Sequence, residues 1–115
     1  MTLTNQPPDL LRGTVDLLVL RTIATGPLHG YAIAQRLRLV SEDVLQVGES
    51  ALYPSLQRLL LKGWVKAAWG VSENNRKARF YKLTARGRRQ LVSQTNRWDE
   101  LVRAVNLVLK PAARK

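Results

Sequence analysis

The sequence predicts a mainly α-helical domain of the α+β class, with three helices, a two-stranded hairpin and one long final helix. Two patterns predict it. Apolar residues recur at helical spacing before residue 63 and after residue 84, whereas residues 64–83 alternate apolar and polar side chains around a polar turn. The length of 115 residues fits a single domain with a core of its own.

The composition narrows the class of protein. With 45% apolar residues, 7 Gly and 5 Pro, the chain is predicted to be globular. It contains no cysteine, which excludes disulfides, thiolate metal sites and cysteine nucleophiles. No apolar run approaches the roughly 18 residues of a membrane span, and no secretory signal opens the chain. We therefore expect no membrane contact and a cytoplasmic location.

The first helix is predicted over about residues 9–25, with Asp9 as its N-cap after two prolines. Its apolar residues occupy more than one face, so we expect it to be covered on several sides, partly by a second copy of the chain. Gly26 and Pro27 end it. A second helix follows at about residues 30–40, with Ile33, Leu37 and Val40 spaced for one buried stripe.

A third helix is predicted over about residues 49–62. Its buried face is formed by Leu52, Leu56, Leu59 and Leu60, and its opposite face by Ser50, Tyr53, Pro54, Gln57 and Arg58. Pro54 lies beyond the first turn and removes a helical hydrogen bond, so we expect an irregular turn but no break.

Strands are predicted at residues 64–71 and 78–83, with a turn at 73–77. Thr84 then caps a final helix that reaches about Leu109. Along it, apolar or small residues recur at alternating spacings of four and three, at Leu91, Thr95, Trp98, Val102, Val105 and Leu109. Such a heptad seam is typical of a helix that packs against another long helix.

The net charge of +11 is unevenly distributed. Residues 1–48 carry four basic and four acidic groups, whereas residues 49–115 carry fifteen basic groups and four acidic ones. No acid occurs from Asn74 through Thr95, a stretch that includes Arg76, Lys77, Arg79, Lys82, Arg86, Arg88 and Arg89. A helix beside a basic hairpin favours double-stranded DNA as the partner, the alternative being a solvated cationic surface.

This order of elements is that of a winged helix-turn-helix with a dimerisation helix attached. The segments "GPLHGYAIAQRL", "ALYPSLQRLLLKGWV" and "ARFYKLTARG" resemble the PadR family of bacterial transcriptional regulators, in its short form with one C-terminal helix. The resemblance covers residues 10 to about 105. It implies a dimeric repressor that binds an inverted-repeat operator and responds to a small ligand. It divides the chain into a DNA-binding domain (1–83), a dimerisation helix (84–110) and a tail (111–115).

The resemblance also implies which residues meet DNA. Ser50, Tyr53, Ser55, Gln57 and Arg58 would lie on or beside the recognition helix, and Arg76, Lys77 and Arg79 on the wing. Gln57 can pair with adenine; Arg58 can pair with guanine, contact a phosphate or form an internal salt bridge. Tyr53 can bind a phosphate or pack against the wing. Where the family has an acidic residue, this chain has Leu60 and Leu61, which places Leu61 on a face assigned to solvent or DNA.

Two further side chains allow alternative interpretations. His29 has no partner histidine or cysteine, so we expect it to cap the second helix and not to bind a metal. Trp98 lies on the heptad seam, where it either stacks a flat aromatic ligand or packs in a core. Trp64 and Trp69 are expected to pack within the hairpin.

The sequence therefore predicts a sequence-specific DNA-binding transcriptional regulator. The alternative is a winged-helix module that binds protein or RNA. An enzyme is not predicted, because one histidine, no cysteine and eight unclustered carboxylates supply no nucleophile, metal set or cofactor site.

Overall fold

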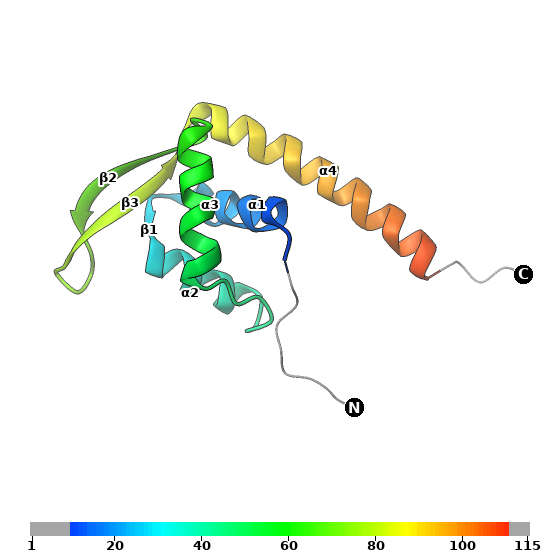
Figure 1. Cartoon of the computed structure of the whole chain (residues 1–115), viewed down its shortest axis with the longest axis horizontal. Helices are drawn as coiled ribbons and strands as arrows, with labels where there is room; N and C mark the ends of the chain where they lie inside the picture. The colour runs from blue at the N-terminus through cyan, green and yellow to red at the C-terminus, as the bar shows by residue number, and fades with distance from the viewer. Residues whose placement is uncertain (1–9, 111–115) are drawn as a thin grey trace, which may run out of the picture.

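The computed structural model describes residues 10–110, so Asp9 and the tail 111–115 lie outside the described residues. The elements follow the predicted order (Figure 1): α1 (Arg12–Thr22), η1 (Ile23–Thr25), β1 (Leu28–His29), α2 (Gly30–Val40), α3 (Glu49–Leu61), β2 (Val65–Val71), β3 (Lys77–Leu83) and α4 (Ala85–Leu109). We call the hairpin of residues 65–83 the wing. The wing and the free end of α4 point away from each other on opposite sides of the domain.

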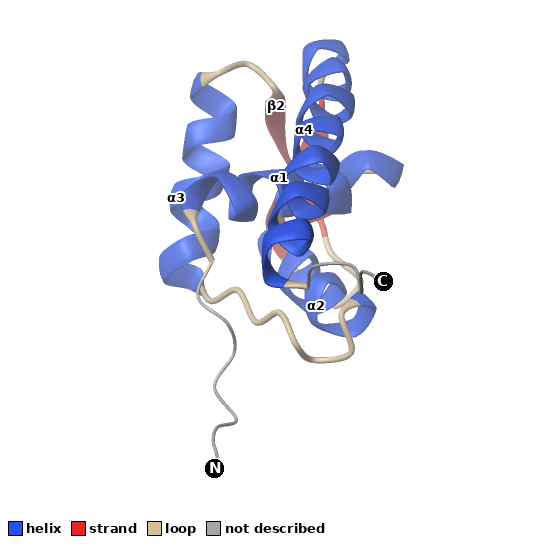
Figure 2. Ribbon diagram, turned by 90° about the vertical axis from the view of Figure 1, so that its right-hand side faces the viewer, coloured by secondary structure: helices blue, strands red, loops and turns tan. Residues whose placement is uncertain are grey.

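The core is formed where α1 meets α2, α3 and the base of the sheet. Val19, Ile33, Leu56 and Leu59 are fully buried there. Helix α1 contacts both α3 and α4, and Figure 2 shows α3 standing on one side of it. The prediction that α1 is covered on several sides is confirmed, because α2, α3 and α4 all contact it. The expected cover by a second copy stays a prediction; Leu11, the N-cap of α1, is 80% exposed.

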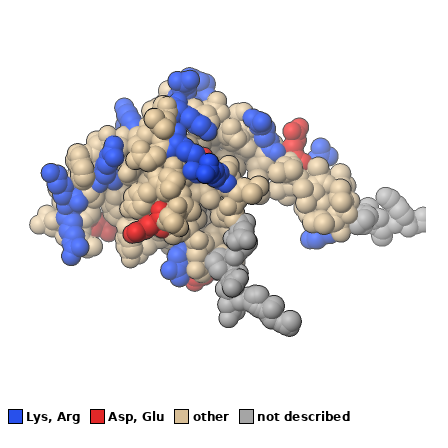
Figure 3. Space-filling model, in the orientation of Figure 1, with Lys and Arg blue, Asp and Glu red and all other residues tan. Residues whose placement is uncertain are grey.

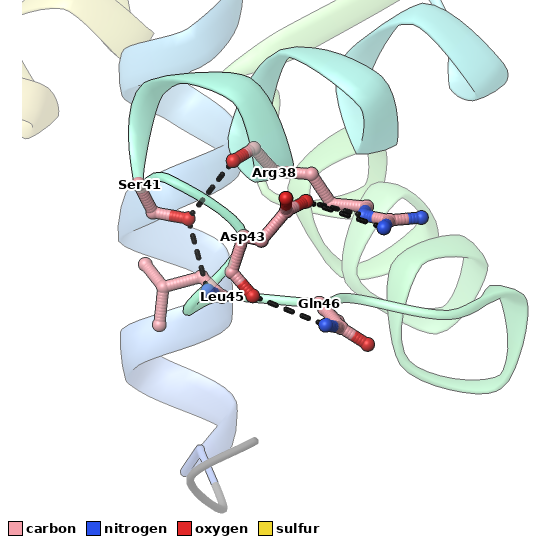
Figure 4. A network of polar contacts seen from close by, with 5 residues as sticks. All are labelled: Arg38, Ser41, Asp43, Leu45 and Gln46. Atoms are coloured by element: carbon pink, nitrogen blue, oxygen red, sulfur yellow. Dashed lines mark hydrogen bonds and ion pairs between the residues drawn. The ribbon is translucent and has the colours of Figure 1, made fainter. Parts of the chain in front are cut away.

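Helix α2 begins where the sequence places it. Ile33 and Leu37 are buried as predicted, but Val40, at the last position of the helix, is 73% exposed, so its assignment to the buried stripe is wrong. The backbone N–H of Ala32 donates to Nδ1 of His29 at 3.2 Å, which confirms the predicted cap. The α2–α3 turn is closed by a polar network (Figure 4), in which Leu45 N–H donates to the Ser41 hydroxyl and Arg38 pairs with Asp43. Glu42 and Asp43 adopt positive φ angles of 55° and 68° in this turn. Helix α3 continues unbroken through Pro54, as expected.

The sheet has the order β1-β3-β2 and is antiparallel throughout. Residues 65–71 pair with 83–77, so Trp69 lies opposite Arg79 and Val71 opposite Lys77. Strand β1 was not predicted, because two residues are too short to show an alternating pattern. Asn75 has a φ of 60° at the hairpin turn, a conformation that asparagine tolerates better than most residues.

Helix α4 is fixed to the base of the wing. Thr84 caps it as predicted, accepting from Gly87 N–H at 3.0 Å and donating to the Gly63 carbonyl at 2.8 Å. A Cβ atom at Gly87 would overlap the carbonyl oxygen of Trp64, so only glycine permits this close approach. Leu91 is the last buried residue of α4; from Thr95 onward the described helix is exposed.

Candidate nucleic-acid interface

The outward face of α3 is almost free of charge. Its exposed residues are Glu49, Ser50, Tyr53, Pro54, Gln57 and Leu61. Leu61 is 87% exposed, which agrees with its assignment to a face turned to solvent or DNA. An amide, two hydroxyl groups and two apolar side chains on one helical face can hydrogen-bond and pack against base edges in a major groove.

Tyr53 lies against the first residue of α2. A Cβ atom built on Gly30 would come within 2.6 Å of the Tyr53 hydroxyl, so the first residue of α2 and this ring are in close contact. The ring is 43% exposed. Gly30 therefore makes room for a tyrosine whose other side remains open to a partner.

Ser55 and Arg58 point inward, toward Asp16 on α1. The Ser55 hydroxyl donates to Asp16 Oδ1 at 2.6 Å, and Arg58 donates through Nε to Oδ2 at 3.0 Å and through Nη2 to Oδ1 at 2.7 Å. Ser55 is 0% exposed, so the expectation that it contacts DNA is wrong for this structure. Of the roles considered for Arg58, the structure shows the internal salt bridge. The hydrogen bond to Asp16 raises the pKa of Arg58 above its ordinary value, against the opposing effect of desolvation.

The cations of the wing are exposed. Arg76, Lys77 and Arg79 all face solvent, and the two ion pairs found among residues 10–110 are elsewhere, Arg38–Asp43 and Arg58–Asp16. Lys77 Nζ lies 5.5 Å from the centre of the Trp69 ring. Trp69 is 67% exposed, which corrects the expectation that it packs within the hairpin. Figure 3 shows Lys and Arg side chains along the wing and across the middle of the visible face, with few acids among them.

An open cleft of about 950 Å³ separates α2 from the wing. His29 and Phe80 both line the cleft, and their rings meet edge to face with centroids 5.4 Å apart. Its lining includes Arg36 and Arg38 but also Asp43 and Glu73, so the cleft itself is not a cationic pocket.

From Thr95 onward, the heptad seam of α4 is exposed in the described protomer, whereas Leu91 at its start is buried in the core. Trp98, Val102 and Val105 are 40%, 36% and 42% exposed, and Leu109 is 69% exposed. Trp98 is therefore not part of the core of the protomer. The seam is a strip of apolar side chains on a helix that extends beyond the domain.

Two kinds of feature are absent from residues 10–110. No group of three or more His, Cys, Asp or Glu side chains is placed to hold a metal ion. No helix in that range is both long enough and apolar enough to cross a membrane.

Sequence reasoning overlooked Asp16, which organises two of the predicted site residues. The sequence did contain a signal for this role. Asp16 is the only charged residue in the segment VDLLVL (residues 15–20), whose other residues are all apolar. An acid on a helix that is covered on several sides needs a buried partner. The identity of that partner, 42 residues away, could not be read from the sequence.

Comparison with known proteins agrees with this geometry. The model of the transcriptional regulator PadR-like family matches residues 19–93. An uncharacterized protein of Lysinibacillus sphaericus is 28% identical over 102 residues, which cover 89% of this chain and 94% of that protein.

Two solved structures are similar over most of the chain. A transcriptional regulator from Clostridium thermocellum is 25% identical with a TM-score of 0.80, and the match covers 90% of this chain and 100% of that one. A PadR-like transcription factor from Bacteroides fragilis is 28% identical with a TM-score of 0.68, covering 84% and 91% of the two chains.

Proposed function

The chain belongs to the PadR-like family of transcriptional regulators, and on this premise we propose that it is a dimeric, sequence-specific repressor whose activity responds to a small ligand. It is a DNA-binding regulator and not an enzyme, as its family indicates. The finer proposal includes an inverted-repeat operator as the target and action in the cytoplasm, where bacterial DNA lies.

One observation carries the proposal: the nearly uncharged outward face of α3 belongs to the same small domain as a wing whose exposed cations form no ion pair within residues 10–110. The wing can neutralise phosphates and release counterions, which gives affinity without sequence preference. Gln57, Ser50 and Tyr53 can reach base edges or the sugar-phosphate backbone from the helix, which gives register and preference. Ser55 and Arg58 are left out of this contact set because both are bound to Asp16.

Dimerisation is supported by the exposed seam of α4. Residues 95–109 form about 22 Å of helix at 1.5 Å per residue. Trp98, Val102 and Val105 on this part of the helix are exposed in the described protomer. A second copy of the same helix would bury such a row of apolar side chains. A two-fold dimer places two recognition helices on two half-sites, which is the reason to expect an inverted repeat. A solution mass equal to one 13.0 kDa chain, under conditions of tight operator binding, would contradict this part.

The test of DNA binding is a salt titration of a mobility shift. Arg76→Ala combined with Lys77→Ala should weaken binding to every duplex and reduce the slope of log K against log salt by about 1.8 per protomer, about 0.9 for each lost phosphate contact. Arg12→Ala combined with Arg21→Ala removes the same charge from exposed positions of α1 and is the matched control.

Unchanged affinity in the wing variant would exclude the wing from the interface. Weak binding of duplex DNA together with tight binding of a protein or a structured RNA would favour the alternative, an interaction module.

The ligand response is proposed to act through Trp98, because an exposed indole on the seam offers a flat face to a planar aromatic compound. Quenching of tryptophan fluorescence by such compounds should be lost in Trp98→Ala and retained in Trp69→Ala. Equal quenching in both variants would remove Trp98 from the proposal.

A further inference from the structure

We propose that Asp16 is a positioning residue for DNA recognition: from α1 it fixes α3 in place and keeps the cation of the recognition helix away from DNA. The inference rests on the proposed DNA-binding function and extends it to a residue that is itself almost fully buried.

The first step is the geometry of one carboxylate with three donors. Asp16 accepts from the Ser55 hydroxyl at 2.6 Å and from two nitrogens of Arg58 at 3.0 and 2.7 Å. The two residues that supply these donor atoms, Ser55 and Arg58, are three positions apart on α3 and so lie on neighbouring turns of the same face. A two-oxygen acceptor that holds two turns at once restricts both rotation and sliding of α3 on α1.

The second step concerns charge. Arg58 is the only Lys or Arg between Glu49 and Leu61. Its side chain is 26% exposed and that of Asp16 is 11% exposed, so their attraction is only partly screened by water. A guanidinium that is already paired in this way releases no counterion from DNA. Arg58 should therefore be absent from the salt dependence of binding, unlike the cations of the wing.

The third step connects the network to the proposed dimer. Helix α1 contacts α4 as well as α3, and α4 carries the seam. Through Asp16, the recognition helix α3 is bound to α1, which also contacts α4. In the proposed dimer, α4 sets the distance between the two recognition helices. Gln57 immediately precedes Arg58 on the helix, so any rotation of α3 that releases Arg58 also moves Gln57.

The experiment uses the full-length chain, a random-sequence duplex and a duplex selected by the wild type from a randomised pool. Binding to both is titrated with salt for the wild type, Arg58→Gln, Asp16→Asn and the double variant Asp16→Asn/Arg58→Gln. Thermal unfolding of each variant is measured in parallel. Lys77→Gln is the matched control for loss of one wing cation.

We expect Arg58→Gln to keep the wild-type salt slope, whereas Lys77→Gln reduces the magnitude of the slope by about 0.9 per protomer. Asp16→Asn should free Arg58 to meet a phosphate, increasing the magnitude of the slope by up to about 0.9 per protomer. The same variant should reduce discrimination between selected and random duplexes roughly ten-fold, the effect of about 1.4 kcal/mol. The double variant removes both charges of the pair, so its salt slope should equal that of the wild type. It also keeps the test valid if Asp16→Asn alone does not fold.

If Arg58→Gln reduced the magnitude of the salt slope by about 0.9 per protomer, the inference would be overturned, because Arg58 would then contact a phosphate in the complex. Wild-type discrimination in a folded Asp16→Asn would overturn it as well. These outcomes leave the proposed function intact, since the wild type still binds its selected duplex. If the wild type showed no preference for any duplex in the pool, the proposed function and this inference would fail together.

Discussion

Helix α3 and the wing are both proposed to meet DNA, but they use their cations in opposite ways. The one cation of α3 is bound to a carboxylate from another helix at 2.7 Å. Arg76, Lys77 and Arg79 of the wing are exposed, and the ion pairs of the described residues do not include them. Along α3 the charge contributes to internal structure, whereas along the wing it is available to a partner.

The difference shows how one small domain can separate two tasks. A free guanidinium on the recognition helix binds any phosphate within reach and adds affinity on every sequence. A recognition helix that presents Ser50, Gln57 and Leu61 instead depends on the identity of the base pairs it meets. In the proposed complex, the wing then supplies the affinity that α3 lacks. Variants that remove an interaction from one region or the other test this division of roles.

The largest expected effect is on stability. Asp16→Ala should lower the free energy of unfolding by about 3 kcal/mol, because it leaves Arg58 and Ser55 without their shared acceptor. This corresponds to a melting temperature about 12 °C lower for a domain of this size. Circular dichroism during heating measures it.

Lys77→Ala is the control on the wing, and its stability should stay within about 0.5 kcal/mol of the wild type. Equal stability of the two variants would show that the cations of α3 and the wing are not used differently in the folded chain.

A smaller effect is expected where α2 meets the recognition helix. In Gly30→Ala the new methyl group would displace the Tyr53 ring, which can move because it is the far end of a flexible side chain. Stability should change little, while affinity for a selected duplex falls roughly five-fold, the value of about one hydrogen bond. The measurement is a mobility shift.

Gly26→Ala, at a position with open space around it, is the matched control for Gly30→Ala. Full affinity in Gly30→Ala would mean that Tyr53 makes no contact with DNA.

The sequence was sufficient for the fold because its signals are local. Helix bounds, the Thr84 and His29 caps and the hairpin follow from periodicity and turn residues, and the structure places them within a few residues of the prediction. Strand β1 was not predicted, because its two residues form a strand only through pairing with Phe80 and Tyr81, which are far away in the sequence.

The site was less predictable, because exposure depends on rotation of a helix about its own axis. Ser55 and Gln57 are two residues apart, yet one is fully buried and the other exposed. Ser55 lies on the buried face of α3 with Leu52, Leu56 and Leu59, where its hydroxyl and Arg58 both donate to Asp16 of α1. In the wing, Trp69 is expected from its sequence position to pack within the hairpin, but the hairpin projects away from the helices and the ring is 67% exposed.

The smallest effect is expected at the second ion pair, which lies in the α2–α3 turn. Arg38 and Asp43 are 3.2 Å apart, but their side chains are 56% and 73% exposed, so water screens the attraction. Arg38→Ala should lower the free energy of unfolding by no more than about 0.5 kcal/mol. The turn keeps its other bonds, including Ser41 Oγ accepting from Leu45 N–H at 2.9 Å. Urea denaturation can measure the difference. A loss as large as that of Asp16→Ala would mean that exposure does not determine what an arginine–carboxylate pair contributes here, and the contrast between α3 and the wing would need another explanation.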